Sequence, residues 1–391
     1  MKKIFIRGPV LSATGYGQQA RFALRALRSR PDLFEVFIQP IPWGKSGWIW
    51  KDDEFRQWMD ERILVTQEGL TSKTLSPDIS LQITIPNEFS KMCPINIGYT
   101  AGVETNKVSP QWLQKGNEMD KILVVSNHAK DSYVNTTMSL DDGKEYKLET
   151  PVDVVWECTP EDELEDIPNF NPRHDFNFLV VSQFGPRKNF EKTIKWFVEN
   201  FYDKEVGLIL KTHIKGSSTM DLSMTESILK GILSDFPKRK CSVSILHGDL
   251  SDGQMRALYE HDSVKCLVNI SHGEGFGLPL FEAARSGLPV MTIPWSGQLD
   301  FLSDGEETFC VPVDFDLKPV HREAVWEGVV QRDSHWAYAK EESYKEKLNY
   351  VFENHQKCLD LAHVMKENIK KRFNAEALYE GFCRSIIEVG E

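Results

Sequence analysis

Two glutamates stand on either side of a glycine-rich turn in the second half of the chain. Glu274 precedes Gly275 and Gly277, and seven residues separate it from Glu282, which lies in a segment with a helical pattern. The two glycines let the backbone approach a ligand closely, and the start of a helix offers N–H groups to a diphosphate. Carboxylates repel phosphates but accept hydrogen bonds from hydroxyl groups. Such a site fits a ligand with a hydroxyl-bearing ring on each side of a diphosphate, which describes a nucleotide sugar.

The order of these residues also carries a family resemblance. The string Glu-Gly-Phe-Gly-Leu-Pro at 274–279, with Glu282 and then Gly-Leu-Pro at 287–289, resembles the signature of the retaining GT-B glycosyltransferases, notably glycosyltransferase family 4. The resemblance implies that Glu274 faces the donor sugar, that Glu282 binds the ribose hydroxyls, and that the backbone between them contacts sugar and phosphate. It assigns to the donor His272, Gly275, Phe276, Gly277, Leu278 and Glu282.

A second stretch supplies positive charge. An apolar strand is predicted at 177–182, and Gln183, Arg187 and Lys188 follow it. The family places an arginine and, five residues later, a lysine against the donor diphosphate. Lys188 matches that lysine, whereas Gln183 stands where the arginine is expected. We expect Arg187 to supply the missing charge, because the leaving diphosphate must be neutralised. Lys211, at the end of the next predicted strand, is a further donor-site candidate.

The first half of the chain opens with a strand, a glycine loop and a helix, which is typical of mononucleotide-binding folds. The loop contains Gly15, Tyr16 and Gly17, and the helix is predicted at 18–28. In the family this loop meets the donor diphosphate, although a tight turn would explain the same residues. Glu104 follows a later strand, near the place where many relatives carry a histidine. We expect Glu104 to replace that contact to the sugar; a helix N-terminal acid is an equal alternative.

Candidate acceptor contacts come from two stretches of the first half. Trp43 and Trp48 lie in a loop rich in tryptophan, glycine and proline, where aromatic rings can stack on sugars or bases or simply pack the loop. Arg21 and Arg25 share a helix face through their four-residue spacing. That face is either a solvated basic surface or a docking surface for an anionic acceptor or a membrane.

Alternating strand and helix patterns predict an α/β protein, and 391 residues exceed what one hydrophobic core comfortably serves. We therefore expect the GT-B fold, in which two Rossmann-like domains with parallel sheets face a central cleft. The predicted parts are an acceptor domain at 1–157, a proline-rich acidic linker at 158–175, a donor domain at 176–370 and a terminal helix at 371–391 that crosses back to the first domain. The whole stretch 336–387 has a helical period.

Composition narrows the class of protein. The net charge is −12, yet residues 1–150 hold 19 basic and 18 acidic residues, so the acidic excess lies in the second half, and a surface-wide basic footprint for nucleic acid is absent. Seven scattered cysteines, no signal-peptide pattern and no apolar run of spanning length predict a cytoplasmic protein without a transmembrane segment. Asp314 and Asp316 form an Asp-x-Asp pair, a metal signature of the other large glycosyltransferase fold. We interpret it as a loop and expect neither a metal nor a cofactor.

The resemblance implies a metal-independent enzyme that moves a sugar, with retention of configuration, from a nucleotide sugar to an acceptor hydroxyl. A UDP-sugar is the expected donor, because UDP is the most frequent nucleotide in such enzymes. A saccharide or a glycolipid is the first candidate acceptor. One alternative is a phage-type glycosyltransferase acting on hydroxymethylated or otherwise modified DNA bases, and another is a non-catalytic protein that binds nucleotide sugars. Nucleobase, sugar, acceptor and oligomeric state are not encoded in these motifs.

Overall fold

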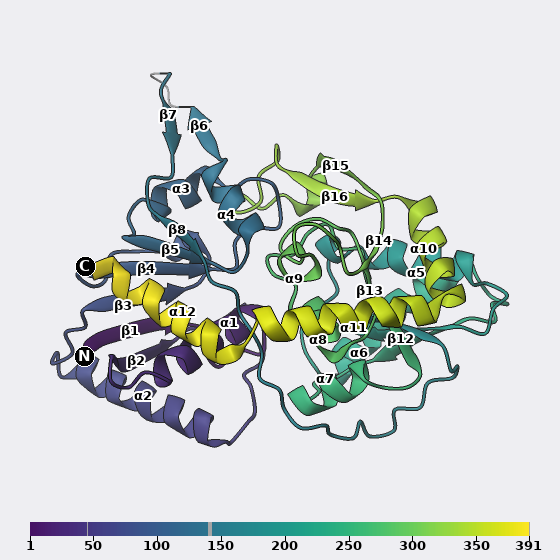
Figure 1. Cartoon of the computed structure of the whole chain (residues 1–391), viewed down its shortest axis with the longest axis horizontal. Helices are drawn as coiled ribbons and strands as arrows, with labels where there is room; N and C mark the ends of the chain where they lie inside the picture. The colour runs from purple at the N-terminus through teal and green to yellow at the C-terminus, as the bar shows by residue number, and fades with distance from the viewer. Residues whose placement is uncertain (45, 140–142, 391) are drawn as a thin grey trace. The chain divides into compact units, whose positions relative to one another are not determined.

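The computed structural model describes residues 1–44, 46–139 and 143–390, which divide into two compact units (Figure 1). Unit 1 contains Met1–Thr159, Val320–Ser334 and the chain from Phe373 on, and unit 2 contains Pro160–Pro319 and His335–Arg372. Each unit is built on a six-stranded sheet whose paired strands all run parallel. The predicted α/β class with two Rossmann-like domains is confirmed.

The sheet of unit 1 has the strand order β2, β1, β3, β4, β5, β8. The strands are β1 (Lys2–Gly8), β2 (Phe34–Pro40), β3 (Ile79–Ile83), β4 (Ile95–Thr100), β5 (Lys121–Val124) and β8 (Val152–Val154), with a separate hairpin of β6 (Thr137–Ser139) and β7 (Glu145–Lys147). The helices are α1 (Gly15–Arg28), α2 (Glu54–Thr71), α3 (Pro110–Gly116), α4 (Asn127–Val134) and α12 (Ala375–Ile387). Strands β3 and β5 are buried along their whole length, as expected for central strands of a parallel sheet.

Helix α1 begins three residues earlier than the sequence predicted. Thr14 caps it, because the Thr14 side-chain oxygen accepts a hydrogen bond from Gly17 N at 3.3 Å. Gly15, Tyr16 and Gly17 therefore form the first helical turn, and the prediction that they form a loop is wrong. A Cβ atom at Gly17 would lie 2.0 Å from the carbonyl oxygen of Ser12, so only glycine fits there.

The C-terminal helix α12 packs against α1 within unit 1 (Figure 1). The Phe382 ring lies edge-on to Phe22, with centroids 5.7 Å apart, and Cys383 donates a hydrogen bond to the carbonyl oxygen of Ala26. The predicted return of the last helix to the first domain is confirmed.

A segment far along the chain, Val320–Ser334, also belongs to unit 1. The carbonyl oxygen of Gly328 accepts hydrogen bonds from Ser109 Oγ at 2.7 Å and from Asn87 Nδ2 at 3.0 Å. Val329 is buried in the same hydrophobic cluster as Trp112 of α3. The sequence did not predict that this segment belongs to unit 1, because its hydrogen-bond partners Ser109 and Asn87 precede it by more than 200 residues.

The sheet of unit 2 has the strand order β11, β10, β9, β12, β13, β14. The strands are β9 (Asn177–Val181), β10 (Gly207–Lys211), β11 (Ser242–Leu246), β12 (Val264–Asn269), β13 (Val290–Thr292) and β14 (Val311–Pro312). The helices are α5 (Phe190–Asn200), α6 (Thr219–Leu233), α7 (Asp252–Tyr259), α8 (Leu278–Ser286), α9 (Leu299–Leu302), α10 (Glu341–Glu353) and α11 (His355–Arg372). The strand predicted at 177–182 and the helix predicted after Gly277 are confirmed.

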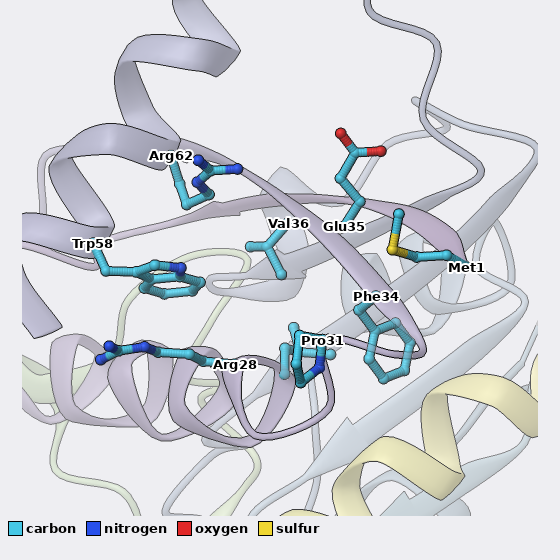
Figure 2. A pocket seen from close by; sticks show the side chains of 9 residues that line it. Met1, Arg28, Pro31, Phe34, Glu35, Val36, Trp58 and Arg62 are labelled. Atoms are coloured by element: carbon cyan, nitrogen blue, oxygen red, sulfur yellow. The ribbon is translucent and has the colours of Figure 1, made fainter.

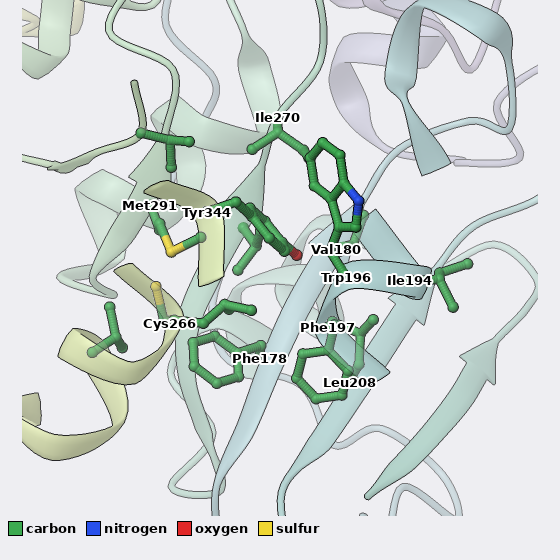
Figure 3. Close-up of a cluster of buried hydrophobic side chains, with 14 of the residues drawn as sticks. Phe178, Val180, Ile194, Trp196, Phe197, Leu208, Cys266, Ile270, Met291 and Tyr344 are labelled. Carbon is green, nitrogen blue, oxygen red and sulfur yellow. The ribbon is translucent and has the colours of Figure 1, made fainter. Parts of the chain in front are cut away.

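The core of unit 2 combines aliphatic and aromatic side chains of its sheet and of the helices packed on it (Figure 3). Phe178 of β9 packs against Phe197 of α5, with ring centroids 5.9 Å apart. Tyr344 of α10 is buried, and its hydroxyl donates a hydrogen bond to the carbonyl oxygen of Thr193 at 3.1 Å. These contacts hold β9 in place, and β9 leads directly into the candidate site.

The helical prediction for 336–387 is wrong at its beginning. Residues His335–Ala339 form β16, which pairs antiparallel with β15 (Phe315–Pro319). Backbone pairing and the burial of Trp336 decide this conformation, and neither is visible in a local period. Asp316, which we expected in a loop, lies on β15 and forms ion pairs with Lys318 and Lys340.

Candidate active site

Strands β9 and β12 are neighbours at the centre of the unit 2 sheet, and the chain leaves them toward opposite edges. Strand β10 lies on the far side of β9, and β13 lies on the far side of β12. Open α/β sheets bind ligands at such a switch point, outside the carboxyl ends of the strands. The segments 182–189 and 270–277 follow these two strands, and they contain the cations and the glutamate that the sequence singled out.

Glu274 lies at the centre of a charged cluster. Its Oε1 is 2.6 Å from Lys188 Nζ, and its Oε2 is 3.1 Å from Arg187 Nη1. Arg187 also donates a hydrogen bond to the carbonyl oxygen of Gly273 at 2.6 Å. The structure thus brings Glu274 together with two adjacent cations that precede it by 87 and 86 positions in the sequence. The Glu274 side chain is only 7% exposed, whereas the side chains of Lys188 and Arg187 are 17% and 28% exposed.

The cations keep this buried carboxylate ionised. Burial alone would raise the pKa of Glu274, but the charges of Lys188 and Arg187 outweigh burial and hold the pKa well below its usual range. Hydrogen bonds from Lys188 and from Ser271 Oγ lower the pKa further. A permanent negative charge therefore faces a pair of positive charges at the switch point.

Three partners of Glu274 were missed by the sequence reasoning. Ser271 Oγ donates to Oε1 at 2.8 Å, Asn269 Nδ2 donates to the same oxygen at 3.3 Å, and Ser296 Oγ accepts from Glu274 N at 2.9 Å. Asn269 and Ser271 are close in sequence and could have been noticed as polar residues at a strand end. Ser296 follows a different strand, and no local signal connects it to Glu274.

The glycine turn leads into α8 as predicted. Gly277 has φ +96°, a left-handed conformation that favours glycine, and it stands at the N-cap of a helix that starts at Leu278. The Phe276 ring is buried against Phe281 and Phe301, so Phe276 offers a ligand its backbone and not its side chain. Backbone N–H groups at such a helix start suit a diphosphate.

Glu282 lies on α8 and accepts a hydrogen bond from Tyr259 OH at 3.1 Å. Burial raises the pKa of Glu282 to about 7, although the charge of Arg285 opposes this shift. Unlike Glu274, this carboxyl group changes charge close to neutral pH. Tyr259 was not anticipated, because it lies on a different helix, α7.

His272 is fixed by the β15–β16 hairpin. Its Nδ1 lies 2.7 Å from the carbonyl oxygen of Ala337, which defines a protonated Nδ1 that donates to that oxygen. Its ring stacks on Trp336 with centroids 5.2 Å apart and contacts Tyr338 at 4.4 Å. His272, two residues before Glu274, is therefore held in place by a hydrogen bond and two aromatic neighbours.

The remaining donor candidates lie at the carboxyl ends of β9 and β10. Gln183 Nε2 donates to the carbonyl oxygen of Ile214 at 2.7 Å, so Gln183 joins two loops of unit 2. Lys211 Nζ donates to the carbonyl oxygen of Gly248, and burial lowers the pKa of Lys211. Gln183 is neutral, so the second positive charge beside Lys188 comes from Arg187.

The candidate residues in unit 1 are mostly aromatic. Tyr16 and Trp43 have ring centroids 4.2 Å apart, and Tyr16 OH shares a hydrogen bond with Thr100 Oγ1 at 2.8 Å. Burial raises the pKa of Tyr16, and the negative charge of Glu104 raises it further, which places Glu104 near this group. Trp48 is 64% exposed on the same loop as Trp43.

The two arginine candidates of α1 are used inside unit 1. Arg21 is 5% exposed, and its Nη1 donates to the carbonyl oxygens of Val10 and Ser12. The guanidinium of Arg25 lies 4.6 Å from the centre of the Phe55 ring of α2. The expected solvated basic face is therefore wrong at Arg21, which is too buried to contact an acceptor, whereas Arg25 is only partly buried.

A cavity of about 370 Å³ lies elsewhere on unit 1, between α1, α2 and β2 (Figure 2). The guanidinium of Arg28 stands 5.4 Å from the centre of the Trp58 ring, and Phe34 and Val36 supply apolar surface. Arg28 is already paired with Glu54. None of the candidate donor or acceptor residues lines this cavity, so it does not belong to the site described above.

Comparison with known proteins identifies the segment that carries the charged cluster. Residues 162–318 match the family of glycosyl transferases group 1. Residues 162–318 form a group 1 glycosyltransferase domain. The UDP-N-acetylglucosamine–peptide N-acetylglucosaminyltransferase GtfA subunit of Streptococcus pneumoniae is 30% identical over 147 residues, which are 37% of this chain and only 26% of that protein. The family match includes Lys188, Glu274 and Glu282.

Solved structures extend the likeness of the group 1 domain to the fold of the whole chain. Anabaena HepE in complex with UDP-glucose superposes with a TM-score of 0.62 at 13% identity and covers 99% of this chain and 100% of its own. Sucrose-phosphate synthase from Thermosynechococcus elongatus gives 0.63 at 13% identity, with 100% and 99% covered. Identities this low show the fold alone, which is GT-B. Within the described ranges, no helix has the length and apolar character needed to cross a membrane.

Proposed function

We propose that this protein is a retaining, metal-independent glycosyltransferase that moves a sugar from a UDP-sugar to a hydroxyl group of a saccharide or glycolipid. The charged cluster at the switch point of unit 2 is the observation that carries the proposal. A buried Glu274 carboxylate holds Lys188 and Arg187 beside the start of α8. A negatively charged ligand and a hydroxyl-rich ring can both be bound there.

The roles follow from charge. Lys188 and Arg187 neutralise the diphosphate, together with backbone N–H groups of the turn and the N-terminus of α8. Glu274 accepts hydrogen bonds from the donor sugar, and Glu282 accepts them from the ribose. Further donor contacts are proposed for Gln183, Lys211, His272, Gly275, Phe276, Gly277 and Leu278.

The reaction needs no protein base. The bond between the anomeric carbon and the diphosphate oxygen breaks, and the acceptor oxygen forms the new bond on the same face of the sugar. The proton of the acceptor hydroxyl passes to the leaving diphosphate oxygen, so atoms and charge balance. Positive charge from Lys188 and Arg187 stabilises the leaving group as its negative charge develops.

UDP is proposed as the nucleotide because two similar proteins point to it. The Anabaena HepE structure contains UDP-glucose, and the name of the pneumococcal relative contains UDP-N-acetylglucosamine. The proposal places the protein in the cytoplasm. Its cysteines are scattered free thiols, most of them buried, which is typical of a reducing compartment.

The acceptor is proposed to bind unit 1 at the loop that contains Trp43 and Trp48. Aromatic faces bind sugar rings through their apolar surface, and Trp48 is exposed on the same loop. Gly15, Tyr16 and Gly17 are proposed as donor contacts and not acceptor contacts, and Glu104 is proposed to accept a hydrogen bond from a hydroxyl group of the donor sugar. The near-neutral charge of residues 1–150 suits an uncharged saccharide better than a nucleic acid.

Thermal unfolding with a panel of nucleoside diphosphates and nucleotide sugars tests the donor. A ligand at 100 times its dissociation constant should stabilise the protein by about 2.7 kcal/mol. We expect the largest shift with UDP and UDP-sugars, a smaller shift for Glu282→Ala, and an unchanged shift for Glu226→Ala, an exposed glutamate of α6. If no nucleotide shifts the unfolding of the wild type, the proposed function is wrong.

An acceptor panel tests the second half of the proposal. Saccharides, glycolipids and duplex DNA with hydroxymethylated bases are incubated with the UDP-sugar that gives the largest shift. Transfer to a saccharide or glycolipid with retained anomeric configuration, unaffected by EDTA, supports the proposal. Transfer to DNA alone would show that the proposed saccharide or glycolipid acceptor is wrong. A product with inverted anomeric configuration would overturn the retaining mechanism.

A further inference from the structure

Ser296 has a backbone conformation that serine rarely adopts. Its φ is +75°, in the left-handed region that favours glycine, and its side chain is buried. Among the described residues other than glycine, four have a positive φ: Lys73, Asn169, Asn189 and Ser296. Asn189 directly follows Lys188, and Ser296 contacts Glu274. Two of the four unusual conformations therefore flank one charged pair, and such strain is often stored at functional sites.

The Ser296 hydroxyl explains why serine and not glycine is present. Its Oγ accepts a hydrogen bond from Glu274 N at 2.9 Å, so its own hydrogen is free to donate to Gln298 Oε1 at 2.8 Å. The amide of Gln298 is oriented for this, because its Nε2 donates to the carbonyl oxygen of Ile293 at 3.0 Å. A buried chain of hydrogen bonds thus runs from the end of β13 to Glu274.

Gly297, the residue after Ser296, also contacts the turn at Glu274. Gly297 N donates to the carbonyl oxygen of Glu274 at 2.9 Å, so both backbone polar groups of Glu274 are held by the segment 296–297. A Cβ atom at Gly297 would lie 1.8 Å from the carbonyl oxygen of Gly275. The segment 296–297 therefore packs directly against the turn that follows Glu274 and restricts its movement.

We propose that Ser296 is a positioning residue that sets the orientation of Glu274 toward the donor sugar. The inference rests on the proposed function, because it assigns to Glu274 the sugar and not the nucleotide. The strained backbone costs free energy that glycine would avoid, and the two hydrogen bonds of the hydroxyl offset this cost. Ser296 acts through the backbone of Glu274 and touches no reacting atom.

Affinity for UDP and for the UDP-sugar, measured by calorimetry, separates this role from a general structural one. Ser296→Ala removes the hydroxyl and keeps the strain, whereas Ser296→Gly removes both. We expect both variants to bind UDP within about twofold of the wild type and the UDP-sugar about tenfold more weakly, the size expected for one lost buried hydrogen bond. Turnover of the bound donor should fall further, because the backbone of Glu274 loses one of the two hydrogen bonds that position it.

Two controls make the result decisive. Lys73→Gly relieves the same kind of strain in unit 1 and should leave both affinities unchanged, and Ser303→Ala removes an exposed hydroxyl from the segment after α9. Ser296→Gly should unfold at a higher temperature than Ser296→Ala, which guards against a variant that merely fails to fold. If both Ser296 variants bind the UDP-sugar as the wild type does, the positioning role is wrong. If the wild type itself binds neither UDP nor any UDP-sugar, the proposed function fails first.

Discussion

Each unit contains a deeply buried glutamate, and the two have opposite electrostatic surroundings. Glu157 follows β8 in unit 1 and is 3% exposed, whereas Glu274 in unit 2 is 6% exposed. Burial raises the pKa of Glu157 to about 8, and its Oε2 has no hydrogen-bond partner among the described residues. Glu274 is equally desolvated, but Lys188 and Arg187 lower its pKa. Burial favours the neutral form of both carboxyl groups, and at Glu274 the two cations outweigh it.

This comparison also separates the two candidate sites. The site in unit 2 depends on charges held in fixed positions, because electrostatic stabilisation of a leaving group requires preorganised partners. The candidate residues of unit 1 instead combine aromatic faces, Tyr16 and Trp43, with a hydrogen bond between the hydroxyl groups of Tyr16 and Thr100.

The largest effect should follow the removal of a cation from the charged cluster. Lys188→Ala leaves the diphosphate without its main positive charge, so we expect turnover to fall about 10³-fold. It also leaves Glu274 with Arg187 alone, so the free energy of unfolding should fall by about 3 kcal/mol. Initial rates and chemical denaturation measure both quantities.

The matched control is Lys345→Ala on α10, whose ammonium group pairs with Glu199 and Glu341 near the surface. Exposed pairs contribute little, so this variant should lose less than about 1 kcal/mol and keep full activity. Wild-type turnover in Lys188→Ala would contradict the role of the cluster.

Replacement of the uncompensated glutamate should improve stability at high pH. The pKa of Glu157 in the folded protein, about 8, lies above the ordinary value of 4.5 for a glutamate, so the unfolded chain ionises first and stability falls as pH rises between these values. Glu157→Gln removes this contribution, which can reach about 1.4 kcal/mol per pH unit. Chemical denaturation from pH 5 to 9 should show that the free energy of unfolding of Glu157→Gln increases relative to that of the wild type as pH rises. Glu68→Gln, at an exposed position, should show no such increase.

The pKa of Glu282 lies between those of Glu274 and Glu157, and its titration should make nucleotide binding depend on pH. Its pKa is raised to about 7, and only the ionised carboxylate accepts both ribose hydroxyl hydrogens. UDP affinity should therefore fall as pH decreases below 7, by up to about tenfold per pH unit if binding requires the charge. Calorimetry at several pH values with Glu282→Gln, which has no charge to lose, checks this. An equal slope in the variant would assign the dependence to another group.

The smallest effect is expected on the aromatic side. Trp48→Ala should raise the KM for the acceptor about fivefold, the size of one aromatic contact, and leave UDP affinity and stability unchanged. Trp326→Ala is the control, because Trp326 is also in unit 1 and is 60% exposed, compared with 64% for Trp48. Equal effects of the two variants would remove Trp48 from the acceptor site.

Patterns that repeat over short distances were read correctly from the sequence. Apolar runs predicted the central strands, and the string around Glu274 predicted a strand, a turn and a helix, because these structures depend on neighbouring residues. Errors arose where distant partners decide. Residues 336–339 pair with β15 and form a strand, and the Thr14 side chain moves the start of α1 to Gly15.

The sequence by itself determined the chemistry available to this protein: two glutamates around a glycine turn, two adjacent cations and an aromatic loop. Only the tertiary structure decided which carboxylate keeps its charge, because Arg187 and Lys188 reach Glu274 across almost 90 residues while Glu157 meets no cation among the described residues. It also placed Ser296 against the backbone of Glu274. A pKa and a hydrogen bond depend on distance in space, and a single sequence records distance along the chain.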